Sequence, residues 1–157
     1  MFNKYIVVWD LDGTLACGQH RLHLLPTKDL TNTNSWDGFN AACGGDAPIQ
    51  DNIDLCIGLA WLHTVVILTG RSNKFREETK AWLRDNGVGY DTLIMRDPND
   101  HRSNPDFKEE ELRKLGLNNI LCAFDDLEHV VKRIRSLGVT CHQVTHYDTP
   151  RTDTREV

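Results

Sequence analysis

The stretch that most constrains the fold is a short apolar run, residues 6–9, with two aspartates and a glycine directly after it. Such a run, bounded by polar residues, is typical of a strand buried on both faces of a parallel sheet. Asp10 and Asp12 leave this strand two positions apart, and since side chains alternate along a strand, their carboxylates point the same way. Gly13 lets the chain turn sharply behind them. Two close carboxylates repel each other and are relieved by a hard cation such as Mg²⁺; a plain Asp-Gly turn is the alternative.

The rest of the chain alternates between apolar runs and amphipathic segments. We expect strands over residues 64–68, 92–95, 120–124 and 139–144, and helices over residues 49–61, 72–86, 105–115 and 127–137. Apolar strands that alternate with helices predict an α/β fold, a three-layer Rossmann-like doubly wound parallel sheet with helices on both faces. At 157 residues, the chain has room for a single domain, residues 1–157, with one substantial core.

Residues 16–48 depart from this alternation. They are rich in Pro, Gly, Asn and Thr, and they predict a loop-rich insertion with one or two short helices, too small for a separate domain. Because the insertion follows the first strand, it is placed to cap a site at the strand ends. His20 and Arg21, within the insertion, are candidates to contact substrate, but the expectation we favour for them is a solvated face.

The composition excludes some classes of protein. A net charge of −5 gives no support for a strongly basic nucleic-acid-binding surface, although a small basic pocket for a nucleic-acid end is compatible with it. The five cysteines show no CxxC or disulfide-like spacing, which favours a reducing compartment. The first strand begins too early to follow a signal-peptide core, and no stretch is long enough to span a bilayer. We therefore expect a cytoplasmic protein without membrane contact.

Polar side chains follow the predicted strands at the point where each strand ends. Thr69-Gly70-Arg71-Ser72 follows the second strand, Arg96-Asp97 the third and Asp125-Asp126 the fourth. In an open parallel sheet these carboxyl ends meet at one edge, where ligands bind. Ser72 is expected to cap the next helix, and one of the two adjacent aspartates is suited to cap the helix after the fourth strand. The second of these aspartates has no such structural task, which favours metal binding.

The order of these motifs resembles that of a known superfamily. Asp10-Leu-Asp12-Gly-Thr, Leu68-Thr69-Gly-Arg, a lysine and Phe124-Asp125-Asp126 are similar to the four ordered motifs of haloacid dehalogenase-type phosphatases. More narrowly, the loop from Met95 to Arg102, the helix from Lys108 and the stretch from Ala123 to Val144 resemble the 3′-phosphatase domain of phage-type polynucleotide kinase/phosphatase. The chain has no G-x-x-x-x-G-K-[ST] phosphate loop, so no kinase activity is expected from it.

The resemblance implies roles for four aspartates. Asp10 is the expected nucleophile that forms an aspartyl-phosphate, and Asp12 the expected general acid and base. Asp10, the backbone carbonyl of Asp12 and one of Asp125 and Asp126 are the expected protein ligands of Mg²⁺, the implied cofactor.

The resemblance also implies how the phosphate is held. Thr69 is expected to donate a hydrogen bond to a phosphoryl oxygen, and Lys108 to supply positive charge, with Lys114 as the alternative lysine. The other expected substrate contacts are Gly13, Thr14, Gly70, Arg71, Arg96 and Arg102. An ordinary surface position is the alternative for Lys108 and for each arginine. Trp36 and Phe39 are candidates to stack a base, with a small core that anchors the insertion as their alternative.

These expectations combine into one main hypothesis, a Mg²⁺-dependent phosphomonoester hydrolase acting on a nucleic-acid 3′-phosphate. A nucleotidase acting on nucleoside monophosphates or other small phosphoesters is the alternative. A non-catalytic phosphate-binding module is disfavoured because each expected catalytic position is filled. The expected partner is thus a phosphorylated nucleic-acid end or a nucleotide, with no obligate protein partner.

Overall fold

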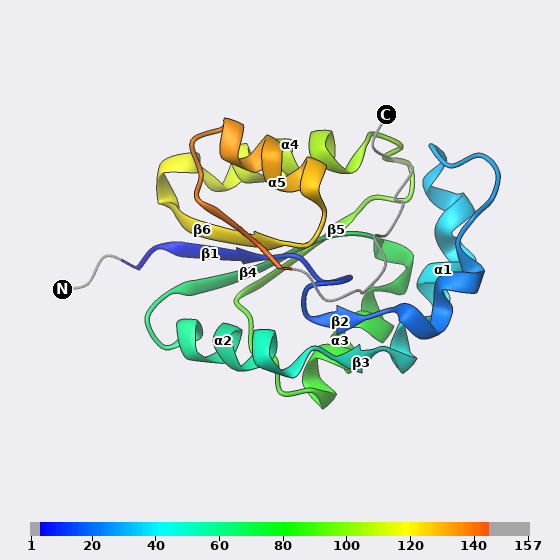
Figure 1. Cartoon of the computed structure of the whole chain (residues 1–157), viewed down its shortest axis with the longest axis horizontal. Coiled ribbons are helices and arrows are strands. Elements are labelled where there is room, and N and C mark those ends of the chain that lie inside the picture. The colour runs from blue at the N-terminus through cyan, green and yellow to red at the C-terminus, as the bar shows by residue number, and fades with distance from the viewer. Residues whose placement is uncertain (1–3, 145–157) are drawn as a thin grey trace.

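A five-stranded parallel sheet forms the middle layer of the protein (Figure 1). The computed structural model describes residues 4–144. The strands are β1 (Ile6–Trp9), β4 (Thr64–Ser72), β5 (Thr92–Arg96), β6 (Ile120–Asp125) and β7 (Cys141–Gln143), and their order is β5-β4-β1-β6-β7. Each neighbouring pair is parallel. The central strand β1 lies between β4 and β6, so the strand order reverses there, which confirms the doubly wound sheet.

Helices cover both faces of this sheet, as the alternation in the sequence predicts (Figure 1). They are α2 (Gln50–Ala60) and α3 (Arg76–Asp85) on one face, and α4 (Asn104–Leu115) and α5 (Glu128–Ser136) on the other. In β1, Val7 and Trp9 are buried under the first pair of helices and Val8 under the second. Each buried side chain of this size contributes about 1.5–3 kcal/mol, so a one-residue slip of the strand, which exchanges its faces, is strongly disfavoured.

The observed elements differ from the predicted ones mainly at their ends. β4 continues to Ser72, because Ser72 still pairs with Arg96 of β5 after a break in register beyond Thr69. The Ser72 hydroxyl accepts a hydrogen bond from the Lys74 amide and starts a 3₁₀ turn, η4 (Asn73–Phe75), so α3 begins later than predicted. Between α4 and β6 lies a further turn, η5 (Leu117–Asn119).

The insertion is built from short elements at the carboxyl end of the sheet (Figure 1). The strands β2 (Ala16–Cys17) and β3 (Ala47–Pro48) pair antiparallel at its base. Between them lie η1 (Gln19–Leu24), η2 (Thr33–Trp36), α1 (Asp37–Ala41) and η3 (Ala42–Gly45). All five cysteines are free thiols. Within residues 4–144, none of the helices combines the length and the apolar character that crossing a membrane requires.

Candidate active site

The site begins where β1 ends, at the reversal of strand order where open α/β sheets bind ligands. Asp10 follows β1, and its amide donates to the Phe124 carbonyl at 3.0 Å, which keeps it in the sheet. The Lys108 ammonium reaches in from α4 and lies 2.8 Å from Asp10 Oδ1 and 2.6 Å from Asp125 Oδ2. All three side chains are buried. Two residues that are 98 positions apart in the chain are thus joined in one ionic cluster.

Burial changes the proton affinity of this cluster. Desolvation raises the pKa of Asp10 to about 6, although the Lys108 ammonium opposes the shift. Burial also works against the charge on Lys108, but the carboxylates of Asp10 and Asp125 outweigh it and raise the lysine pKa. The lysine therefore keeps its charge inside the protein.

Three carboxylates at this point form a group with the geometry of a cation site. Oxygen atoms of Asp10, Asp125 and Asp126 lie within 4.8 Å of one another. Asp125 also accepts a hydrogen bond at 3.0 Å from the amide of Leu127, where α5 begins, so it serves the helix start as well. Carboxylate oxygens are the donors that hard divalent cations prefer, and this set fits Mg²⁺.

The Asp12 carboxylate lies apart from that group, against two buried arginines. Arg21 Nη2 and Arg71 Nη2 are each 2.6 Å from Asp12 Oδ1. Asp46 lies on the other side of the arginines and accepts from Nε and Nη2 of Arg21 at 2.7 and 2.6 Å. Although burial disfavours charged arginines, Asp12 raises the pKa of both guanidinium groups.

Arg21 and Asp46, two residues of the ion-pair network around Asp12, were not predicted as site residues. Arg21, expected on a solvated face, is completely buried, so that expectation is wrong. Its burial depends on Asp46, 25 positions later, and on Phe39, whose ring lies 4.0 Å from the guanidinium carbon. No local pattern in the sequence pairs these residues. The only indication in the sequence was the presence of charged residues, Arg21 and Asp46, in an insertion that is otherwise loop-like.

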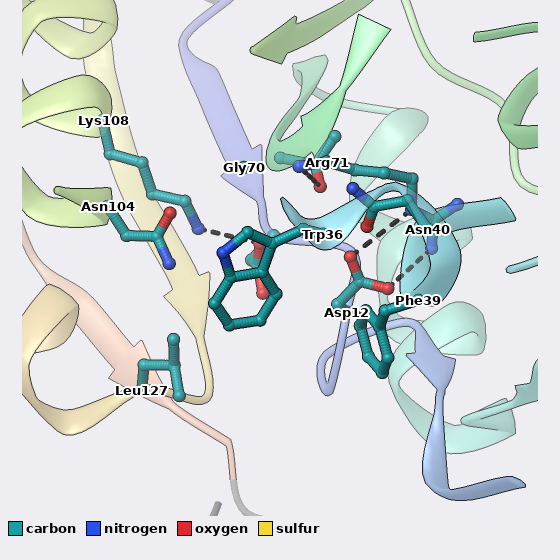
Figure 2. Close-up of a pocket in the computed structure, with 11 residues that line it drawn as sticks. Asp12, Trp36, Phe39, Asn40, Gly70, Arg71, Asn104, Lys108 and Leu127 are labelled. Carbon is teal, nitrogen blue, oxygen red and sulfur yellow. Dashed lines mark hydrogen bonds and ion pairs between the residues drawn. The ribbon is translucent and has the colours of Figure 1, made fainter. Parts of the chain in front are cut away.

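A pocket opens between the sheet edge and the insertion (Figure 2). Figure 2 shows Lys108 on one side and Asp12 with Arg71 on the other, with the Trp36 ring between them. The full lining consists of Asp10, Asp12, Trp36, Phe39, Asn40, Thr69, Gly70, Arg71, Asn104, Lys108 and Leu127. The insertion therefore contributes one wall of the pocket, through η2 and α1.

Thr69 and Gly70 line the pocket at the carboxyl end of β4. The Thr69 hydroxyl oxygen accepts from the Arg71 amide at 3.1 Å, which leaves its hydrogen to donate into the pocket. A Cβ on Gly70 would lie 2.6 Å from Asn104 Oδ1, so a larger residue there would displace the asparagine. The absence of a side chain at Gly70 thus lets the backbone of β4 lie close to α4.

Gly13 and Thr14, expected to contact substrate, are outside the pocket lining and shape the loop instead. Gly13 has φ of +81°, a conformation that favours glycine. The Thr14 hydroxyl donates to Asp10 Oδ2 at 3.3 Å, so it orients the carboxylate from behind.

The three candidate arginine clamps lie in different surroundings. Arg71 lines the pocket, but its guanidinium is held by Asp12 and by the Thr79 hydroxyl at 2.9 Å. Arg96 is buried beneath the pocket, where it donates to the Gly70 carbonyl at 3.2 Å. Arg102 is paired at the surface with Asp100 and Glu110. Neither Arg96 nor Arg102 is among the residues that line the pocket, and a phosphate clamp at either of them stays a prediction.

The two candidate lysines are also separated by the structure. Lys114 has a side chain that is 59% exposed and pairs with Glu110 and Glu111 on α4, away from the pocket. Lys108, by contrast, has a side chain that is 5% exposed and points at Asp10. The two lysines lie six positions apart on α4, and the geometry brings only Lys108 to the cluster.

Comparison with known proteins places this site in a family. The model of the polynucleotide kinase PNKP phosphatase domain matches residues 4–148. The chain belongs to this family. It is therefore a phosphatase domain, and its structure is that of the haloacid dehalogenase fold.

Solved structures agree with this family and with the fold. A chain of the Pnkp1/Rnl/Hen1 RNA repair complex is 28% identical with a TM-score of 0.72, and the match covers 93% of this chain and 44% of that one. A chain in a second structure of the Pnkp1/Rnl/Hen1 complex is 26% identical with a TM-score of 0.73, covering 94% and 48%. This protein thus spans less than half the length of either chain.

A haloacid dehalogenase-like hydrolase from Streptococcus pneumoniae shares the fold alone. It is 14% identical, with a TM-score of 0.65, over 92% of this chain and 86% of that one. No curated protein matches the chain.

Proposed function

We propose that this domain is a Mg²⁺-dependent phosphomonoester hydrolase that works through an aspartyl-phosphate on Asp10. The observation that carries the proposal is the buried Lys108 ammonium, held between Asp10 and Asp125 at the end of β1 and open to a pocket. A buried cation beside a carboxylate suits phosphoryl transfer, in which stabilisation of charge is the main contribution to catalysis.

The metal ligands proposed for Mg²⁺ are carboxylate oxygens of Asp10, Asp125 and Asp126, with the backbone carbonyl of Asp12. When bound, the ion supplies positive charge that offsets the negative charge of the phosphoryl group. Lys108 is the protein's own cation at this point and pairs with both Asp10 and Asp125.

The residues of the pocket then divide the reaction into two steps. In the first, an Asp10 oxygen bonds to phosphorus while the bond from phosphorus to the leaving oxygen breaks, and Asp12 gives that oxygen a proton. In the second, Asp12 takes a proton from water as the water oxygen bonds to phosphorus. The bond between phosphorus and Asp10 breaks, and phosphate is released. Lys108 and Thr69 both line the pocket, and in this mechanism the ammonium and the hydroxyl contact phosphoryl oxygens in both steps.

The substrate we propose is the 3′-phosphate of a nucleic-acid end. Support comes from the family and from similarity to a chain of the Pnkp1/Rnl/Hen1 RNA repair complex over 93% of this chain. Trp36 and Phe39 line the pocket and pack edge to face, with ring centroids 6.3 Å apart, so they both anchor the insertion and border the site. The expectation that no obligate protein partner is needed stays a prediction.

A comparison of substrates tests the proposal. Phosphate release with Mg²⁺ is measured for a 3′-phosphorylated oligonucleotide, the same oligonucleotide phosphorylated at the 5′ end, and nucleoside 3′- and 5′-monophosphates. We expect fastest release from the 3′-phosphorylated oligonucleotide and none above background with Asp10→Asn. Faster release from a mononucleotide would instead support the nucleotidase alternative. Absence of release from every substrate would contradict the proposal.

A further inference from the structure

Asp46 is a completely buried carboxylate that takes no part in the two steps above. It accepts hydrogen bonds from Arg21 Nε and Nη2 at 2.7 and 2.6 Å and from Arg71 Nη2 at 3.4 Å. His20 Nε2 lies 2.9 Å from its Oδ1. Burying a carboxylate costs free energy of desolvation, which its ion pairs and hydrogen bonds must offset. Removing any one of these partners is therefore expected to disturb the others.

The groups that Asp46 holds are the ones that hold Asp12. Nη2 of Arg21 contacts both carboxylates at 2.6 Å, and Nη2 of Arg71 lies 2.6 Å from Asp12 and 3.4 Å from Asp46. Asp12 and Arg71 line the pocket, whereas Asp46 and Arg21 lie behind them. Asp46 is thus separated from the proposed acid and base by one layer of guanidinium groups.

The position of Asp46 is itself fixed to the core. Its carbonyl accepts from Trp82 Nε1 of α3 at 2.7 Å, and its amide donates to the Cys43 carbonyl at 3.1 Å. The next residue, Ala47, begins β3, where the insertion rejoins the main fold. The orientation of the arginines is therefore set by the place where the insertion is anchored.

The charges in this cluster match only when Asp46 is present. Two guanidinium groups face two carboxylates, so loss of one carboxylate leaves a buried positive charge with half of its partners. Both arginines would then be free to rotate towards Asp12 and to change the direction in which its carboxyl points. A role limited to tethering the insertion is the alternative explanation.

We propose that Asp46 is a positioning residue, which holds Arg21 and Arg71 so that the Asp12 carboxyl faces the oxygen leaving from phosphorus. The inference rests on the proposed function, because it assigns proton transfer to Asp12. The positioning role predicts that loss of Asp46 slows formation of the aspartyl-phosphate most for substrates whose leaving group needs a proton.

The test compares two leaving groups in Asp46→Asn. An oligonucleotide 3′-phosphate releases an alcohol, which needs a proton, whereas p-nitrophenyl phosphate releases a phenolate, which leaves without one. General acid catalysis contributes about 10²–10⁴-fold, so we expect kcat/KM, which reports formation of the aspartyl-phosphate, to fall by about 100-fold on the oligonucleotide. On p-nitrophenyl phosphate we expect kcat/KM to fall by less than about 5-fold, since that leaving group does not draw on the acid. The second step, in which Asp12 takes a proton from water, is common to both substrates and does not enter kcat/KM. Equal losses of kcat/KM on both substrates, or no loss on either, would overturn the positioning role.

Two further variants keep the test decisive. Asp54→Asn, on the exposed face of α2, is the matched control and is expected to leave both rates unchanged. His20→Ala removes one contact of Asp46 from a side chain that is 44% exposed, and we expect a several-fold loss of kcat/KM on the oligonucleotide only. If Asp46→Asn does not fold, the ratio of kcat/KM on the two substrates in His20→Ala decides, and an unchanged ratio overturns the inference. Wild-type protein that hydrolyses neither substrate would instead overturn the proposed function, and this inference with it.

Discussion

Lys108 carries a buried charge at a helix position where a lysine is unfavourable. It lies near the start of α4, where an acidic residue suits the helix dipole better. In the structure its ammonium is buried between Asp10 and Asp125, which is tolerable only because both carboxylates pair with it. The position that is unfavourable for the helix is thus favourable for the site.

Replacing Lys108 by glutamine is expected to reduce kcat at least about 100-fold, because pre-organised charge at a transferring phosphoryl group is worth several kcal/mol. The matched change, Lys114→Gln, is expected to leave activity within about 2-fold, since exposed pairs contribute about 0–1 kcal/mol. Initial rates with saturating substrate check both. A large loss in Lys114→Gln with an active Lys108→Gln would contradict this assignment.

The raised pKa of Asp10 links the stability of the fold to protons and to Mg²⁺. Because burial raises the pKa of Asp10 to about 6, from 3.8, the folded state binds this proton more tightly than the unfolded chain. That contribution to stability is present in acid and is lost as the pH rises through about 6. In the proposed magnesium site, a cation bound by the three carboxylates would take over this role above that pH, and protons would compete with it below.

We therefore expect millimolar Mg²⁺ to raise Tm at about pH 7.5 by several degrees, given roughly 2–4 °C per kcal/mol for a domain of this size. At about pH 5 the rise should be clearly smaller, because protons then compete for Asp10. Thermal unfolding followed by circular dichroism measures both values. Asp126→Asn, which removes one of the three carboxylates, should reduce the rise at the higher pH. An equal rise at both pH values would count against metal binding through Asp10.

Among the elements, the strands, the helices and the place of the insertion were predictable, whereas the contacts that fold the insertion were not. The runs 64–68 and 120–124 lie inside β4 and β6, because a strand buried on both faces is apolar throughout. The predicted strand over 139–144 is reduced to β7, an edge strand that pairs, within residues 4–144, with β6 alone. The insertion depends on contacts between residues far apart, such as Thr33 with Asp100 and His101, which no local periodicity reveals.

Those contacts tie the insertion to the loop after β5 and lead to a prediction about its stability. The Thr33 hydroxyl donates to the Asp100 carbonyl, and its amide donates to His101 Nδ1 at 3.1 Å. Thr33→Ala removes the first of these bonds, worth about 0.5–1.5 kcal/mol. Amide hydrogen exchange over residues 30–41 should therefore accelerate by about 2- to 10-fold, with the sheet unchanged.

The control for this experiment is Thr92→Ala, at the exposed start of β5. It should leave exchange in the insertion at the wild-type rate. Uniform acceleration across the sheet in Thr33→Ala would show that the insertion and the core open together, contrary to this account.

For the molecule as a whole, charge determines how a nucleic-acid end can be held. The net charge is −5, and the cations nearest the pocket are paired, Lys108 with Asp10 and Arg71 with Asp12. Recognition is therefore expected to centre on the terminal phosphate. The net charge and the motifs at the ends of the strands could be identified from the sequence. The pairing of Arg21 with Asp46 could be identified only in the folded chain.

A shallow salt dependence is expected for an oligonucleotide 3′-phosphate. A protein that neutralises Z phosphates of a single strand loses affinity with a slope of about −0.7Z against log salt, and we expect Z of about one or two. KM measured from about 50 to about 200 mM salt, with short and long oligonucleotides, gives this slope. A steep slope that grows with oligonucleotide length would indicate an extended contact surface that this account does not include.

A covalent bond between Asp10 and phosphorus distinguishes the proposed mechanism from direct attack by water, and this bond can be trapped. The enzyme is mixed with a 3′-phosphorylated oligonucleotide and Mg²⁺, quenched in acid during turnover and treated with borohydride, which reduces an aspartyl-phosphate to homoserine. Mass spectrometry of the digested protein is expected to find homoserine at position 10 and nowhere else, and Asp10→Asn should show none. Rapid turnover with no modification at position 10, or with phosphate on another residue, would contradict the account.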